Sequence, residues 1–199
     1  GRQARLARLP SVREPLDGTR FAFTEAEDHV AVTCPWGNLI RCYEPGTRFG
    51  AMRLGMPYVR FDVPPGSAPG IARFYVEIMG TPAGLGEGDG QRLLFRETDA
   101  RQPEFDGHHV AIYLADFSGP YERLMKRDLI TEESDQHQYR FVDIVDPDSG
   151  AQLFRLEHEV RSMRHPMYAR PLVNRNPAQT NRSYAPGYED AAWALPPGS

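Results

Sequence analysis

The sequence predicts an α+β fold in which β-α-β units repeat around a cleft for a small molecule. A strand over 58–63 and another over 109–114 are each followed by apolar residues at helical spacing. Their first residues, Tyr58 and His109, are 51 positions apart, and both strands alternate apolar with polar side chains. Because successive side chains of a strand point to opposite faces, we expect one face to pack on the helix and the other to line the cleft.

The remaining elements follow from the same two periodicities. Two apolar stripes predict buried helix sides: Ile71, Phe74, Tyr75, Ile78 and Met79, and then Tyr121, Leu124, Met125 and Leu129. Strands are expected at 19–23, 29–35, 38–44 and 91–97 and in the hairpin 139–160, and a short helical pattern ends at Pro10.

Composition excludes several classes of function. The 199 residues are 40% hydrophobic, which is enough for one large domain or two small ones. Charges of both signs are interspersed, the net charge is −4, and no basic stripe could follow a phosphate backbone, so we expect no nucleic-acid partner. No apolar run approaches the roughly 20 residues of a membrane span, and the first ten residues lack an apolar signal-peptide core. We therefore predict a cytoplasmic protein with no membrane partner.

The two cysteines are expected to be separate buried thiols. Cys34 and Cys42 flank a turn at PWGN, and a tight hairpin there would place Cys34 opposite Leu39. This pairing argues against a disulfide and fits a reducing compartment.

Several motifs resemble the vicinal-oxygen-chelate superfamily, which includes glyoxalases, extradiol dioxygenases and bleomycin-resistance proteins. HHVAIYLADF is similar to the first strand of that family, with His109 at its ligand position, and GQRLLFRET is similar to its fourth strand, with Glu97 at its end. The hairpins CPWGNLIRCYEP and DPDSGAQLFRLEHE resemble its hairpin of strands three and four. The resemblance covers the chain from about Thr19 to Arg161.

The resemblance implies a glyoxalase-like fold, in which βαβββ modules pair into curved mixed sheets around a metal ion or ligand. It divides the chain into an incomplete first module at 1–50, a second module at 51–104, a third module at 105–163 and an irregular C-terminal arm at 164–199. Because the first module is incomplete, it leaves a sheet edge or apolar face to be covered, and we expect a homodimer.

Three positions depart from the family pattern. Tyr58 stands where the second module would carry a histidine ligand, and Arg41 and Phe154 stand where hairpin glutamates are common. An intact site of two histidines and two glutamates is therefore not present.

A smaller metal centre remains one interpretation of the sequence. Its ligands would be His109, Glu97 and Glu157, a set that suits Fe(II), Mn(II), Mg(II) or Zn(II). The alternatives are a cleft-lining or core histidine at His109, a solvated strand end at Glu97 and a solvated charged face at Glu157. His108 and His158 are expected to be structural, and His29 and Glu44 are weaker ligand candidates.

Two functions follow from these alternatives. The first is a metal-dependent lyase, isomerase or dioxygenase, in which Glu97 or Glu157 moves a proton and Tyr58 supplies a catalytic phenol. The second is a metal-free protein that binds a small molecule or confers resistance. Under either function, Arg60 and Tyr113 would bind an anionic or aromatic ligand.

Overall fold

In the computed structural model, the residues described are 18–44, 46–49, 55–84, 91–168, 176, 179 and 187. The fold is α+β, as predicted, and the described residues form two α-helices and three open sheets. The chain divides into two compact units, Gly1–Pro57 and Tyr58–Ser199. The helical pattern expected before Pro10 and most of the expected C-terminal arm lie outside the described residues. No helix in the described parts is long and apolar enough to cross a membrane.

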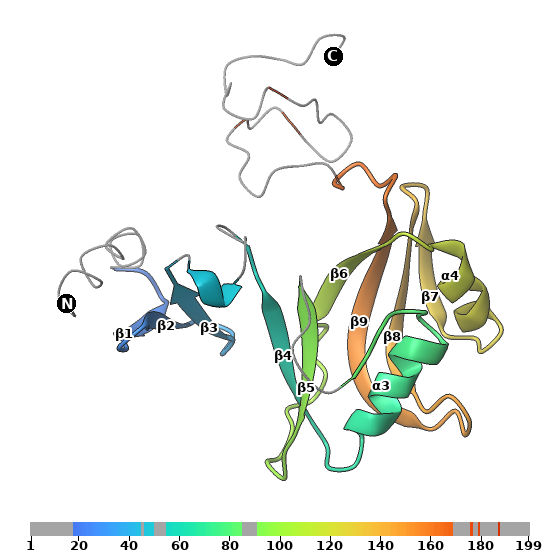
Figure 1. Ribbon diagram of the computed structural model, residues 1–199, viewed down its shortest axis with the longest axis horizontal. Coiled ribbons are helices and arrows are strands. Elements are labelled where there is room, and N and C mark those ends of the chain that lie inside the picture. Colours follow the sequence, from blue (N-terminus) through green and yellow to red (C-terminus); the bar gives the residue numbers. More distant parts are fainter. Residues whose placement is uncertain are drawn as a thin grey trace. The chain divides into compact units, whose positions relative to one another are not determined.

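The first unit contains a three-stranded antiparallel sheet (blue in Figure 1). Its strands are β1 (Ala22–Glu25), β2 (His29–Thr33) and β3 (Leu39–Tyr43), followed by a 3-10 turn at Thr47–Phe49. The expected opposition of Cys34 and Leu39 is wrong by one residue, because Leu39 pairs with Thr33 and the Cys34 amide donates to the Asn38 carbonyl. Both thiols are free; Cys34 is buried, as expected, whereas Cys42 is only half-buried.

The second unit contains two sheets. The strand β4 (Tyr58–Val63) leads into the helix α3 (Ala68–Glu77) and then pairs in parallel with β5 (Arg92–Glu97). The next elements are β6 (His109–Leu114), α4 (Ser118–Met125), β7 (Ile130–Ser134), β8 (Gln138–Val145) and β9 (Gln152–Ser162). The four strands form a mixed sheet in the order β6-β9-β8-β7, with β6 parallel to β9.

The sequence predicted most of these elements and missed β7. The strand β7 lies at the edge of its sheet and pairs with β8 alone. Its sequence, ITEES, is mostly polar and therefore shows no apolar alternation. The helix α4 also ends at Met125, earlier than its apolar stripe suggested. Met125 itself is exposed, whereas Leu124 is fully buried and Leu129 packs against the core.

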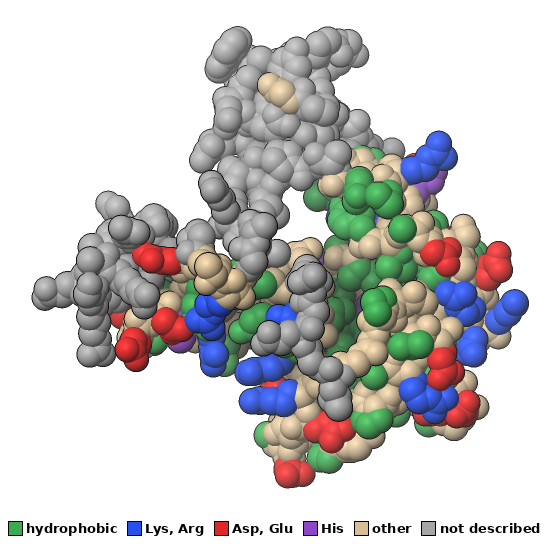
Figure 2. Space-filling model, viewed as in Figure 1, with side chains coloured by type: hydrophobic (Ala, Val, Ile, Leu, Met, Phe, Trp, Pro, Cys, Tyr) green, Lys and Arg blue, Asp and Glu red, His purple; other side chains and the backbone are tan. Residues whose placement is uncertain are grey.

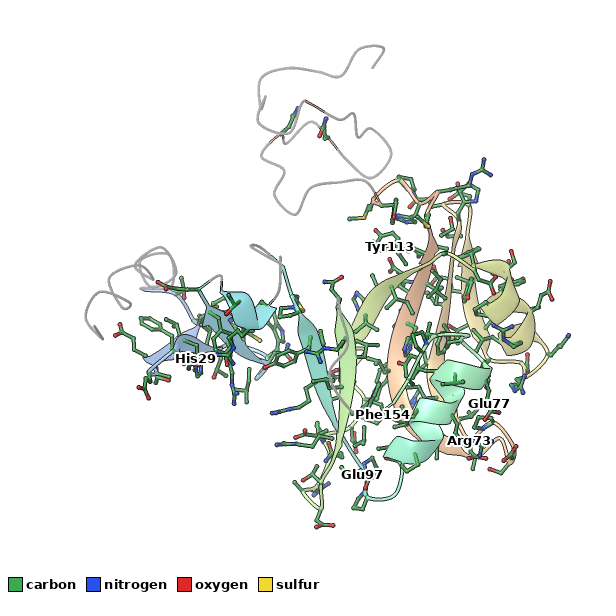
Figure 3. The ribbon with its side chains drawn as sticks, in the orientation of Figure 1. His29, Arg73, Glu77, Glu97, Tyr113 and Phe154 are labelled. Carbon is green, nitrogen blue, oxygen red and sulfur yellow. The ribbon has the colours of Figure 1, made fainter. Side chains whose placement is uncertain are left out.

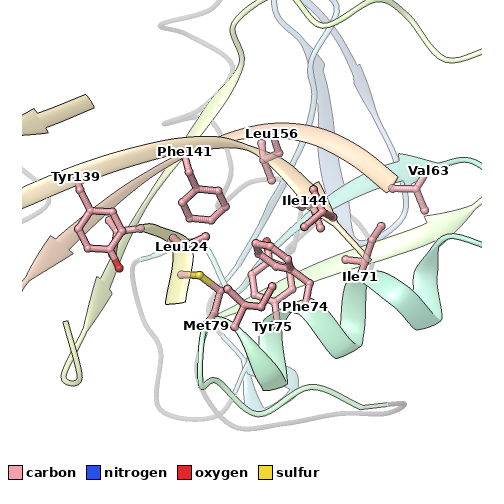
Figure 4. Packing of buried hydrophobic residues seen from close by; sticks show 13 residues of the cluster. Val63, Ile71, Phe74, Tyr75, Met79, Leu124, Tyr139, Phe141, Ile144 and Leu156 are labelled. Atoms are coloured by element: carbon pink, nitrogen blue, oxygen red, sulfur yellow. The ribbon is translucent and has the colours of Figure 1, made fainter. Parts of the chain in front are cut away.

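Both helices contribute to one hydrophobic core. The helix α3 packs against β8 and β9 as well as β5 (Figure 1), and α4 adds Leu124 to the same cluster. Phe74 of α3 packs on Phe141 of β8 within this cluster (Figure 4), with ring centroids 5.7 Å apart. Gly80 ends this helical segment with a φ of 66°, and the Thr81 amide donates to the Tyr75 carbonyl.

The strands of the second unit alternate as predicted. Phe61 and Val63 of β4 belong to or pack against the core, as do the three apolar residues of β6, Val110, Ile112 and Leu114. Tyr58 and His109 have the opposite parity and therefore point away from it. In Figure 1, β4 and β5 run in the opposite direction to β6 and β9, so the first residues of one pair lie toward the same end as the last residues of the other.

His158 is a core residue, as predicted. Its Nδ1 donates to the Leu156 carbonyl at 2.7 Å, so its Nε2 accepts a hydrogen bond from the Tyr75 hydroxyl at 2.6 Å. The imidazole stacks on Phe141 with ring centroids 4.3 Å apart. Burial favours the neutral imidazole and lowers the pKa of His158 to about 4, and it raises the pKa of the Tyr75 hydroxyl.

This buried pair makes the protein sensitive to acid. The pKa of His158 rises toward 6.5 on unfolding, so its contribution is fully present above pH 6.5 and is lost as the pH falls toward 4. The loss amounts to roughly 3 kcal/mol, since one pKa unit is about 1.4 kcal/mol. The double variant Tyr75→Phe/His158→Leu should show a flatter dependence of unfolding free energy on pH across this range. The single variant Tyr75→Phe keeps the histidine and is the matched control, and equal slopes in all three proteins would contradict this account.

Candidate polar-face site

The side chains that point away from α3 and α4 form a second surface of the second unit, which we call the polar face. Its members on β4 and β5 are Tyr58, Arg60, Asp62, Arg92, Leu94 and Arg96. Its members on β6, β8 and β9 are His109, Ala111, Tyr113, Gln138, Arg140, Asp143, Arg155, Glu157, Glu159 and Arg161. The polar face therefore carries every residue predicted for the site except Glu97.

The strands β6 and β9 bring His109 and Glu157 together. The two residues are direct partners in the parallel register, so their side chains lie side by side on the polar face. The imidazole is exposed and makes no hydrogen bond or ion pair with a described residue, whereas the Glu157 carboxylate accepts a hydrogen bond from Arg140 at 2.9 Å. The histidine is thus the freer of the two groups.

A buried carboxylate organises the centre of the polar face. Glu159 is only 5% exposed and lies between two guanidinium groups. Arg140 donates to its Oε2 at 2.7 Å, and Arg161 donates to its Oε1 through Nε at 2.6 Å. A buried carboxylate is costly unless it is paired in this way. These contacts hold Arg140 and Arg161 in fixed positions.

Tyr113 lies where this network meets an aromatic cluster. Its hydroxyl accepts a hydrogen bond from Arg161 at 3.0 Å, and its ring packs edge-on against Tyr168 with centroids 5.3 Å apart. His165 is buried beside Tyr113, and its Nε2 has no hydrogen-bond partner. Burial and the nearby Arg161 lower the pKa of His165, which favours the neutral ring. Tyr113 itself remains 36% exposed.

Glu97 occupies a different part of the second unit. It alternates with Leu93 and Phe95 on the side of β5 that faces the core. Its Oε1 accepts a hydrogen bond from the Ala68 amide at 2.9 Å, at the first turn of α3. The residue before the helix, Ser67, donates a hydrogen bond from its hydroxyl to the Pro64 carbonyl and makes no side-chain cap. The Ala68 amide is therefore available to Glu97. Figure 3 shows Glu97 beside the start of α3 and Tyr113 toward the opposite end of the strands.

The residues present do not fit the predicted metal centre. In the described part of the chain, no three His, Cys, Asp or Glu side chains gather closely enough to hold a metal ion. One oxygen of Glu157 is bound to Arg140, and Glu97 caps α3. A guanidinium held beside the carboxylate also repels a divalent cation.

The pair β4–β5 carries a different chemistry at the corresponding position. In its parallel register Tyr58 opposes Arg92, whereas in β6–β9 His109 opposes Glu157. Arg92, rather than Glu97, is therefore the register equivalent of Glu157. Arg60 is the other residue of this pair that was predicted to bind ligand. Its Nε lies 3.9 Å from Oδ1 of Asp62. The pair thus offers a phenol and guanidinium groups in place of metal ligands.

A surface pocket of the second unit lies beside α4. It has a volume of about 430 Å³ and adjoins the start of α4 and the β7–β8 turn. It is lined by Phe117, Ser118, Tyr121, Glu133, Ser134, Asp135, His137, Gln138 and Tyr139. The Tyr121 hydroxyl is already bonded to Glu133 at 2.7 Å, and none of the predicted site residues borders this pocket.

The other histidine candidates have local partners. His108 stacks on Phe61 and bonds to Asp106, which agrees with the structural role expected for it. His29, in the first unit, bonds to Asp28 at 2.7 Å and packs against Tyr43.

The weaker carboxylate candidate, Glu44, differs from these histidines because its buried Oε1 has no hydrogen-bond partner.

Sequence reasoning missed the arginines that define the polar face. Arg140, Arg161 and Arg92 each follow the period-two alternation of their strands, and this pattern could have placed them on the same side as His109. Their partners depend on the register between strands, which alternation alone does not give.

Comparisons with protein-family models, with curated proteins and with solved structures found no match. The resemblance to the vicinal-oxygen-chelate superfamily therefore rests on the motifs quoted from the sequence, and the function is argued from the polar face.

Proposed function

We propose that the second unit binds a small oxygen-bearing, partly aromatic molecule on its polar face without a metal ion. The observation that carries this proposal is unused hydrogen-bonding capacity. The Tyr58 hydroxyl and the Arg92 guanidinium, at the end of the strands that also carries Tyr113, make no hydrogen bond or ion pair with a described residue. The same is true of the His109 imidazole, which lies toward the opposite end of the polar face. Their neighbour Glu159 is bound by both Arg140 and Arg161, although the Nε of Arg140 is also buried without a partner. Binding sites typically present a few such polar groups on a rigid frame.

The aromatic part of the proposed ligand is supported by the exposed rings near Tyr113. Tyr113 and Tyr168 contact each other edge-on, and Met163 is exposed in the segment that leads from β9 to Tyr168. Tyrosine and methionine side chains offer adaptable apolar contacts at binding surfaces. The ion pairs with Glu159 fix Arg161, and Arg161 in turn holds the Tyr113 hydroxyl.

The metal-free alternative is preferred to the metal-dependent enzyme because the carboxylates are already used. A metal ion would have to displace Arg140 from Glu157 and recruit a third ligand. Metal-free binding is also what the resemblance implies for a chain with Tyr58, Arg41 and Phe154 at ligand positions.

Thermal unfolding tests this proposal, with catechol as the small aromatic probe. With a chelator present, catechol should raise the unfolding midpoint of the wild-type protein, by about 2.7 kcal/mol of stability at a hundredfold excess over its Kd. Zn(II), Mn(II) or Fe(II) alone should leave the midpoint unchanged. In Arg140→Gln, Glu157 and Glu159 lose a guanidinium, so this variant should gain a response to metal that a further His109→Ala change removes.

The matched control is Arg155→Gln, which removes an arginine of the same face that pairs with Asp143 rather than Glu157. It should show no metal response. A wild-type midpoint that rises with metal and ceases to do so in His109→Ala would refute the metal-free proposal. If neither catechol nor a related phenol raises the midpoint, binding on the polar face is rejected.

We also propose that the protein is a homodimer that pairs through its first unit. Trp36 and Leu39, at the β2–β3 hairpin, are 76% and 79% exposed. Large apolar side chains of this kind are enriched in interfaces. Light scattering at micromolar concentration should give a dimer mass, and Trp36→Ser/Leu39→Asn should give a monomer. A monomeric wild-type protein would exclude this pairing.

A further inference from the structure

The polar side of β4–β5 has an excess of positive charge. It carries three arginines, Arg60, Arg92 and Arg96, but the single carboxylate of Asp62. Figure 2 shows blue arginine side chains gathered over these two strands. The neighbouring part of the polar face, on β6, β8 and β9, has its arginines paired with carboxylates. The unbalanced charge is therefore confined to β4 and β5.

Asp62 neutralises one arginine and has little capacity left for the others. Arg96 binds both of its oxygens, through Nε at 2.9 Å and Nη2 at 2.6 Å. These hydrogen bonds lower the pKa of Asp62, so the carboxylate is ionised and fully used. Arg60 approaches it only to 3.9 Å, which is an ion pair without a hydrogen bond.

Among the three arginines of β4 and β5, Arg92 is the one that lacks a partner in the described part of the chain. Its Nε is buried and has no hydrogen-bond acceptor, and the guanidinium forms no ion pair with a described residue. A buried donor left unsatisfied destabilises the folded protein, and the effect is larger when the group is charged. A fully solvated arginine would not be destabilising in this way, because its Nε would donate a hydrogen bond to water. The residue as a whole is only partly buried, so the remaining N–H groups of the guanidinium, which have no described partner, are suited to an acceptor that is supplied from outside the chain.

Tyr58 adds a second donor at the same level of the sheet. It is the direct register partner of Arg92, and its hydroxyl makes no hydrogen bond with a described residue. A guanidinium presents its N–H groups as a planar fork that matches the two oxygens of a carboxylate or phosphate. A phenol beside that fork can donate a third hydrogen bond to the same oxyanion.

We infer that Arg92 and Tyr58, with the charge of Arg60 behind them, bind the oxyanion group of a small ligand. This inference rests on the proposed function and specifies its ligand as a carboxylate or a phosphate ester. The carboxylates of Glu157 and Glu159 on the same face disfavour a long polyanion, so the ligand is a small molecule.

Titrations with benzoate and with inorganic phosphate test the inference, at constant ionic strength in a buffer free of other oxyanions. At least one probe should raise the unfolding midpoint of the wild-type protein. Arg92→Gln should weaken its binding about tenfold or more, the factor that corresponds to 1.4 kcal/mol. Arg92→Lys keeps the positive charge without the planar fork, so its affinity for the probe should fall between those of the wild type and Arg92→Gln. Without a probe, Arg92→Gln should unfold at or above the wild-type midpoint, because no satisfied bond is lost.

Arg127→Gln is the matched control, since it removes the same charge from an exposed position just after α4. It should bind the probes as the wild type does. A response to benzoate alone supports a carboxylate ligand, and a response to phosphate alone supports a phosphate ester. Equal binding by wild type and Arg92→Gln would overturn the inference. If catechol binds and neither anion does, the oxyanion site is rejected while the proposed function stands, and if no probe binds, both are rejected.

Discussion

Both helices of the second unit cover the same side of its strands, and this one-sided burial constrains the rest of that unit. The helix α3 follows β4 in the chain but packs against β8 and β9, so residues far apart in sequence share one core. The buried hydrogen bond between Tyr75 and His158 joins α3 to β9 at its centre. Every strand residue must then point either into this core or onto the polar face.

The constraint explains why charged residues are concentrated on the other side. No helix in the described part of the chain covers this face, yet Glu159 is buried on it. Arg140 and Arg161 pair with the carboxylate and so offset the cost of removing its charge from water. This network makes the centre of the face rigid. At one end of the face, Tyr58 and Arg92 have no hydrogen bond or ion pair with a described residue and are available for a ligand.

Local alternation was enough to predict the two faces of β4 and β6. The buried side of α3 was predictable for the same reason, because its apolar stripe has helical spacing. The strand β7 was not predictable, since an edge strand with the sequence ITEES has no continuous apolar face. Glu97 and Arg92 show the limit most clearly. The family pattern directed attention to Glu97, but the parallel register of β4–β5 places Arg92 in the equivalent position, and the start of α3 takes the carboxylate.

The central claim is that ligand binds to the polar face, and not in the pocket beside α4. Nuclear magnetic resonance of the tyrosine and histidine side chains distinguishes the two locations, because each has its own reporters. When benzoate is added, the ring signals of Tyr58 and Tyr113 should move, while those of Tyr121 and His137 in the pocket stay in place. Shifts confined to Tyr121 and His137 would contradict the account and place the binding site in the pocket beside α4.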